Sequence, residues 1–168
     1  YRLTDMTREV QYVHLQVHSE YSIEDSLLTV SNIVDLAEKT NMESVALTDV
    51  GNVFALVKFY QAAIKKKIKP IIGVEIRVVE EVEEGEYPAT NINKKRRFYR
   101  LILLCQNRQG YTNLSELMTK SYLSGQINGV AHVDRKWLTT EITQGLIAIE
   151  PGFLGCSAQR KEASLEAL

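Results

Sequence analysis

Short apolar runs alternate with amphipathic segments along this chain, and this alternation limits the folds open to it. Runs of β-branched and aromatic residues predict strands at 12–17, 44–48, 70–79, 98–106 and 146–150. Between them, apolar residues recur at helical spacing at 30–37 and 53–64, with Asn52 as the expected N-cap of the second helix. A third helix is predicted from Asn113, as its N-cap, to just before Gly125. Strands that alternate with helices predict an α/β domain with parallel strands.

Composition places the chain among ordinary globular domains. Its 168 residues suit one domain, and 45% of them are hydrophobic while 24% are charged. The net charge is -1 and the isoelectric point is near 6.4, so no general attraction to nucleic acid is expected.

The cysteines and the hydropathy pattern indicate the compartment. Cys105 and Cys156 are the two cysteines and form no CxxC pair, so reduced thiols are expected rather than a disulfide framework or a zinc ribbon. No apolar run approaches membrane-spanning length, and no charged start is followed by a signal-like apolar stretch. A cytoplasmic location without a membrane partner is predicted.

Residues 80–97 change from acidic to basic, with glutamates in the first half and lysines and arginines in the second. This composition predicts a solvated excursion between two strands. A partner-binding role for the segment is an open alternative.

Residues 14–25 have the layout of a metal-binding strand and loop. In a strand, the side chains of His14, Gln16 and His18 share one face, and Asp25 can fold back over the strand's end. Imidazoles and a carboxylate that converge suit zinc or manganese, but Gln16 is a poor ligand. In the alternative interpretation the histidines are partly buried polar groups and Asp25 is a turn residue.

Further blocks in the same order carry a family resemblance. They are Leu-Thr-Asp-Val-Gly-Asn at 47–52, Leu-Val-Lys-Phe-Tyr at 56–60, Ile-Lys-Pro-Ile-Ile-Gly-Val-Glu at 68–75, Asn-Arg-Gln-Gly-Tyr-Thr-Asn-Leu at 107–114 and Asp-Arg-Lys-Trp-Leu at 134–138. With residues 14–25 they resemble the PHP (polymerase and histidinol phosphatase) domain at the N-terminus of the bacterial DNA polymerase III alpha subunit. The resemblance runs from about residue 12 to 155 and implies a distorted (β/α)7 barrel.

The family's late Asp-x-His pair has no counterpart before Leu168, so residues 1–168 are expected to be the N-terminal portion of such a domain, without the rest of the barrel or the polymerase core.

The resemblance also implies a set of metal-ligand positions. His18, Asp25 and Glu75 match family ligands, and Asp49 matches the aspartate of the family's Thr-Asp-His block. The remaining ligand positions fall on Gln16, Val50, Arg100 and Gly152. Arg100 brings a permanent positive charge, so it is expected to pair with Asp25 or Glu75 in place of metal. His14 and Asp49 are nearby polar groups, and Asp49 has the alternative role of shaping the turn between a strand and a helix.

A decayed ligand set of this kind resembles the proteobacterial branch of the family. The resemblance implies no catalytic residue, metal or cofactor in this segment, which would act as structure and as the dock for a separate proofreading exonuclease subunit. The parent chain would be a DNA-directed DNA polymerase, a nucleotidyltransferase that uses magnesium on primer–template DNA within the polymerase III holoenzyme.

The alternative is a residual metal-dependent phosphoesterase or 3′–5′ exonuclease, whose metal site would need Gln16, His14 or Cys156 as a substitute ligand. A free-standing PHP phosphatase is a third possibility. The candidate docking surfaces are the outer helices around 53–66 and 113–124.

Overall fold

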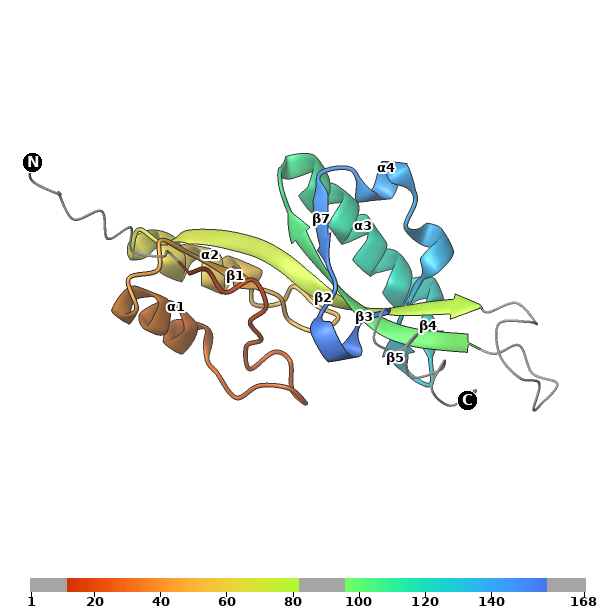
Figure 1. Ribbon diagram of the computed structural model, residues 1–168, viewed down its shortest axis with the longest axis horizontal. Coiled ribbons are helices and arrows are strands. Elements are labelled where there is room, and N and C mark those ends of the chain that lie inside the picture. The colour runs from red at the N-terminus through yellow and green to blue at the C-terminus, as the bar shows by residue number, and fades with distance from the viewer. Residues whose placement is uncertain (1–11, 82–95, 157–168) are drawn as a thin grey trace, which may run out of the picture.

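A long strand, β2 (Lys69–Glu81), runs through the molecule and joins its two lobes (Figure 1). The computed structural model describes residues 12–81 and 96–156. The first part of β2 pairs in parallel with β1 (Ser44–Leu47), and the part from Gly73 onward pairs antiparallel with β3 (Arg96–Cys105). β6 (Val133–Asp134) joins the far end of β2 in parallel. Because one strand serves both lobes, residues near its middle lie where the lobes meet.

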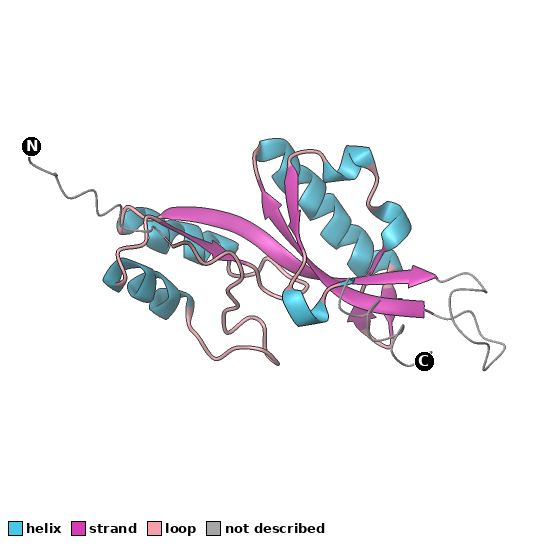
Figure 2. Cartoon of the chain, viewed as in Figure 1, coloured by secondary structure: helices cyan, strands magenta, loops and turns pink. Residues whose placement is uncertain are grey.

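The helices are divided between the lobes (Figure 2). α1 (Val30–Lys39) and α2 (Leu56–Lys65) pack beside β1 and the first part of β2. The other lobe holds α3 (Arg108–Ser124), α4 (Thr140–Thr143), β7 (Leu146–Ile149), the hairpin of β4 (Gln126–Ile127) and β5 (Val130–Ala131), and the 3₁₀ turns η1 (Arg135–Trp137) and η2 (Gly152–Leu154). Within the described ranges no helix is both long and apolar enough to cross a bilayer.

The sheet is mixed, so the prediction of parallel strands is wrong for β3 and β7. Both β2–β3 and β3–β7 are antiparallel pairs. The sequence between β2 and β3 has no helical periodicity, and two strands joined without a crossover helix pair antiparallel. The predicted charged excursion at 80–97 lies mostly outside the described residues.

The strand predicted at 12–17 is also absent. The segment runs beside β1, where Ala46 N–H donates to the carbonyl of His14 (2.9 Å) and Thr48 N–H to that of Val17 (2.8 Å). Two residues, 15 and 16, therefore lie between these bonds on one side and only residue 47 on the other, which breaks a regular ladder. The Thr48 hydroxyl accepts from the Val17 N–H (3.0 Å) in place of a backbone carbonyl.

Two helix starts differ from the prediction. α2 begins at Leu56 rather than after Asn52, whose amide donates to the Tyr21 carbonyl and whose oxygen accepts from the Phe54 N–H. α3 begins at Arg108, with the Asn107 side chain accepting from the Gly110 N–H at 3.0 Å. The predicted end before Gly125 is confirmed.

The block at 107–114 has a structural explanation. Asn113 is buried inside α3 and donates to the carbonyls of Glu141 and Gln144, each at 3.0 Å, which holds α4 against α3. A Cβ atom at Gly110 would lie 1.8 Å from the carbonyl oxygen of Gly145, so only glycine allows this approach. The block therefore fastens the turn before β7 to α3.

The two faces of the sheet differ in composition. On one face, alternate residues of β2 and β3 pack against α3, forming a core that includes Val74, Ile76, Val78, Leu103 and Leu117. The opposite face carries Glu75 and Arg100 beside a smaller apolar cluster of Ala46, Ile102 and Leu104. Glu75 pairs with Ile102 and is therefore diagonal to Arg100 on the same face.

Candidate functional site

Glu75 is the centre of a polar cluster where the two lobes meet. Its side chain is fully buried in the middle of β2. Val50 forms an isolated parallel bridge with Glu75, and the Gly51 N–H donates to the Glu75 carbonyl at 2.8 Å. The turn after β1 is thereby fixed against the strand that carries this carboxylate.

Three side chains reach the Glu75 carboxylate from distant segments. Gln16 Nε2 donates to Oε2 at 2.8 Å, and His18 Nε2 lies 2.9 Å from the same oxygen. Arg100 Nη1 donates to Oε1 at 2.8 Å and also to Asp25 Oδ2 at 3.0 Å. The predicted pairing of Arg100 is confirmed with both carboxylates, so one guanidinium ties the 19–28 loop to the sheet.

These contacts set the charge state of the cluster. Burial alone would raise the pKa of Glu75, because a carboxylate loses solvation in the interior. Hydrogen bonds from His18, Arg100 and Gln16 outweigh burial and lower the pKa of Glu75 from 4.5 to about 2. Burial acts against the charge on Arg100 as well, but its hydrogen bonds to Glu75 and Asp25 prevail and raise the pKa of the guanidinium. The cluster is therefore an ion pair at neutral pH.

A second buried carboxylate, Asp49, lies just beyond the end of β1. Its oxygens accept from Ser19 N–H (2.6 Å), Ser19 Oγ (2.7 Å) and Ser22 Oγ (2.7 Å). Ser22 Oγ also accepts from the Val50 N–H at 2.9 Å. Asp49 thus fastens the start of the 19–28 loop to the turn after β1. It shapes this turn, but through the serines rather than through a helix N-terminus.

Ser19 and Ser22 are site residues that the sequence did not predict. They are serines of the Ser-x-x-Ser-x-x-Asp pattern that ends at Asp25, and that spacing was the available signal. Hydroxyls are common in loops, and their acceptor lies about 30 residues away along the chain. Only the folded chain brings Asp49 to them.

The other predicted site positions lie apart from Glu75 or carry no ligand atom. The His14 ring packs edge-on against Tyr12, with ring centroids 4.8 Å apart. Val50 is buried, and Gly152 begins η2. Cys156 is half-buried and packs against the apolar core beside α3. The structure thus brings together Gln16, His18, Asp25, Glu75 and Arg100.

The side chains gathered around Glu75 do not fit the metal cluster that a catalytically active PHP domain would hold. Such a cluster needs several imidazoles and carboxylates around each ion. Here the two carboxylates, Asp25 and Glu75, share the Arg100 guanidinium within 3.0 Å. In the part of the chain that the structure describes, no three His, Cys, Asp or Glu side chains converge as a metal site requires.

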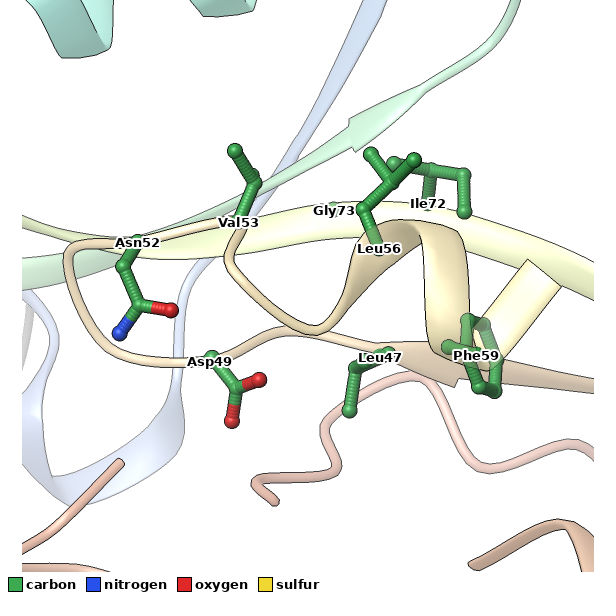
Figure 3. A pocket seen from close by; sticks show the side chains of 8 residues that line it. All are labelled: Leu47, Asp49, Asn52, Val53, Leu56, Phe59, Ile72 and Gly73. Atoms are coloured by element: carbon green, nitrogen blue, oxygen red, sulfur yellow. The ribbon is translucent and has the colours of Figure 1, made fainter. Parts of the chain in front are cut away.

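A small pocket lies beside Asp49, between the end of β1, the start of α2 and β2 (Figure 3). Its lining is mostly apolar, with Leu47, Leu56 and Phe59 among the side chains. The polar members, Asp49 and Asn52, are engaged in hydrogen bonds. No buried side-chain nitrogen or oxygen in the described ranges lacks a partner. This pocket therefore offers packing rather than a polar binding site.

Comparison with known proteins assigns the family. A family model described as the PHP domain matches residues 14–164. The chain belongs to the PHP domain family. A curated relative from Pseudomonas aeruginosa, named DNA polymerase III subunit alpha, is 36% identical over 163 residues, which are 95% of this chain and 13% of the relative. A relative of the same name from Borreliella burgdorferi is 41% identical over 120 residues, 71% of this chain and 10% of the relative.

This PHP domain spans about a tenth of the length of these relatives. Among solved structures, an amidohydrolase from Chromobacterium violaceum is similar over 65% of this chain and 32% of its own, with 21% identity and a TM-score of 0.45. The mixed α/β architecture of the described residues agrees with the fold class that the sequence predicts.

Proposed function

We propose that this PHP domain is a non-catalytic scaffold at the N-terminus of a replicative DNA polymerase III alpha subunit, and that it docks a separate proofreading exonuclease subunit. The names of the curated relatives support the first part. One observation carries the non-catalytic role: the Arg100 guanidinium lies between Asp25 and Glu75, where a metal-dependent site would need metal ions. The residues that remain at ligand positions, His18, Asp25 and Glu75, are bound to one another or to Arg100.

The chemistry of this cluster supports structure rather than hydrolysis. Metal-dependent phosphoesterases activate water on an ion that neutral imidazoles and carboxylates hold. In this cluster Glu75 is hydrogen-bonded to Gln16, His18 and Arg100, and Arg100 cannot be deprotonated to make room for a metal. This arrangement does not favour the alternative of a residual phosphoesterase or 3′–5′ exonuclease.

The parent chain, in this proposal, is a cytoplasmic DNA-directed DNA polymerase. Nucleotidyl transfer to primer–template DNA would use magnesium in a polymerase core outside these residues. The domain would need no cofactor of its own. Its partners would be the rest of the alpha chain, the holoenzyme and the exonuclease subunit.

Trace-metal analysis tests the loss of the site. After extensive dialysis the purified protein should retain no stoichiometric zinc or manganese, with an EDTA-treated sample as the reference. Two or three retained ions per chain would contradict the scaffold proposal.

Titration with the exonuclease subunit of the same organism tests docking. Saturable binding that persists in a folded His18→Ala variant is expected, because the proposed role does not depend on ligand chemistry. Phosphodiester cleavage by the domain itself, suppressed by chelators, would support the enzyme alternative instead.

A further inference from the structure

One nitrogen atom joins a loop to the sheet. Arg100 Nη1 donates both to Asp25 Oδ2 of the loop, at 3.0 Å, and to Glu75 Oε1 of β2, at 2.8 Å. The other oxygen of Glu75 is in contact with Gln16 and His18, which leaves Oε1 to Arg100. Two carboxylates that share one positively charged nitrogen are bridged in the way that a bound cation bridges its oxygen ligands.

The outer half of the 19–28 loop gains little from apolar packing. Ile23 is 87% exposed and Leu27 is 94% exposed among the residues that the structure describes. The start of the loop is fastened by the contacts of its serines with Asp49. The order of the outer half therefore depends mainly on its polar contacts.

Two ion pairs join this outer half to other segments in the described part of the chain. Arg77 Nη2 lies 3.9 Å from Glu24, whose side chain is 84% exposed, so this pair is weak. The contact between Asp25 and Arg100 is shorter, at 3.0 Å, and both side chains are largely buried. Arg77 and Arg100 lie opposite each other on β2 and β3, where like charges repel. The carboxylates of Asp25 and Glu75 hold Arg100 in place against this repulsion.

We propose that the carboxylates of Asp25 and Glu75 form a cation site that orders the 19–28 loop, and that Arg100 is its built-in occupant. The guanidinium takes the place of the metal cluster that the family pattern implies, and it supplies the positive charge between the two carboxylates. A free cation should then occupy the site once the Arg100 side chain is removed. This role does not depend on the docking of an exonuclease subunit, because every contact lies within the chain.

Hydrogen exchange in the full-length parent chain, read by mass spectrometry, tests the role of the site because it reports on this loop separately. The N–H groups of Asp25 and Ser26 donate to the Ser22 carbonyl at 2.8 and 3.0 Å, so their exchange measures the order of the loop. Arg100→Ala should speed this exchange at least about tenfold. Arg77→Ala is the matched control and should change it less than about threefold.

Added cations then probe the emptied site. In Arg100→Ala, millimolar guanidinium chloride or manganese chloride should slow the exchange again toward that of the unchanged chain. Sodium chloride at the same ionic strength should not, because it only screens charge. Neither added cation should alter the exchange of the unchanged chain, whose site is filled.

Two further substitutions separate charge from hydrogen bonding. Arg100→Lys keeps a charged nitrogen and should hold the loop, because one nitrogen makes both contacts. Arg100→Gln keeps an N–H donor without the charge and should loosen the loop nearly as much as Arg100→Ala. Circular dichroism of each variant shows whether it is folded.

The outcomes decide the proposal in either direction. Exchange that Arg100→Ala leaves unchanged would overturn it, since another part of the parent chain would then hold the loop. Faster exchange that neither guanidinium nor manganese reverses, or that sodium chloride reverses equally, would also overturn it. If Arg100→Ala is not folded, slow exchange in Arg100→Lys with fast exchange in Arg100→Gln supports the proposal, and equal exchange in the two contradicts it.

Discussion

Glu75 and Asp49 are both buried carboxylates, and one backbone hydrogen bond joins the two residues. Their side chains are nevertheless stabilised in different ways. The Glu75 N–H donates to the Asp49 carbonyl at 3.1 Å. Glu75 is balanced by Arg100, with His18 and Gln16 on its other oxygen. Asp49 is held by hydroxyls and one backbone N–H. The first carboxylate depends on a charge from a strand of the other lobe, and the second on neutral groups of one loop. The two sites should therefore respond differently to mutation and to pH.

Removal of Arg100 should produce the largest loss. Arg100→Ala leaves the fully buried Glu75 without its cation and should lower the free energy of unfolding by about 3 kcal/mol. Urea unfolding followed by circular dichroism measures this. Arg77→Ala is the matched control, because Arg77 is the cross-strand neighbour of Arg100 but pairs at 3.9 Å with Glu24, which is 84% exposed. That control should cost less than about 1 kcal/mol. Equal losses in the two variants would refute a special role for Arg100.

Acid should weaken the Glu75 site across a defined pH range. The pKa of Glu75 is lower in the folded chain, about 2, than its ordinary value of 4.5, so the unfolded chain binds more protons between these values. Stability from this group is complete above about pH 4.5 and is lost as the pH falls toward 2, by up to about 3 kcal/mol. Unfolding free energies of the unchanged protein and of Glu75→Gln, measured at several pH values, should converge as the pH falls. Parallel curves would show that Glu75 titrates normally.

Mutations in the 19–28 loop, which Asp49 holds, should lower the free energy of unfolding less than the loss of Arg100 does. Ser22→Ala removes one donor to Asp49 and the acceptor of the Val50 N–H, so it should cost about 1.5 kcal/mol. Ser26→Ala removes only an exposed contact with the Leu28 N–H and serves as the control, with an expected cost below about 0.5 kcal/mol. Thermal unfolding of both variants measures the difference. A larger loss in Ser26→Ala would contradict the assignment of Ser22.

Neutralising Asp49 should have the smallest effect. In Asp49→Asn the amide oxygen can still accept from the Ser19 N–H and Ser22, and the amide nitrogen can donate to Ser19 Oγ. The expected cost is below about 1 kcal/mol, less than that of Glu75→Gln at neutral pH, because no cation loses a buried partner. Chemical denaturation of the two variants side by side provides the measurement. A larger loss in Asp49→Asn would show that Asp49 also balances a charge.

The contrast between the two sites also shows what motifs can reveal. Arg100 was predicted beside Asp25 and Glu75 because the family pattern places these three at neighbouring positions, and the structure confirms it. The role of Ser19 and Ser22 was missed because nothing local links a loop hydroxyl to a carboxylate about 30 residues away. His14 shared the apparent periodicity of Gln16 and His18, but its ring packs against Tyr12 because the segment is not a regular strand.

The sequence by itself determined where most elements lie and which residues could carry charge at the site. Apolar periodicity located α1, and runs of β-branched residues located β1, β2, β3 and β7, because these signals depend on neighbours along the chain. The tertiary structure decided the direction of the strands and the partners of both carboxylates. Strand pairing and ion pairing depend on groups that are distant in sequence, and only packing of the two lobes along β2 brings those groups together.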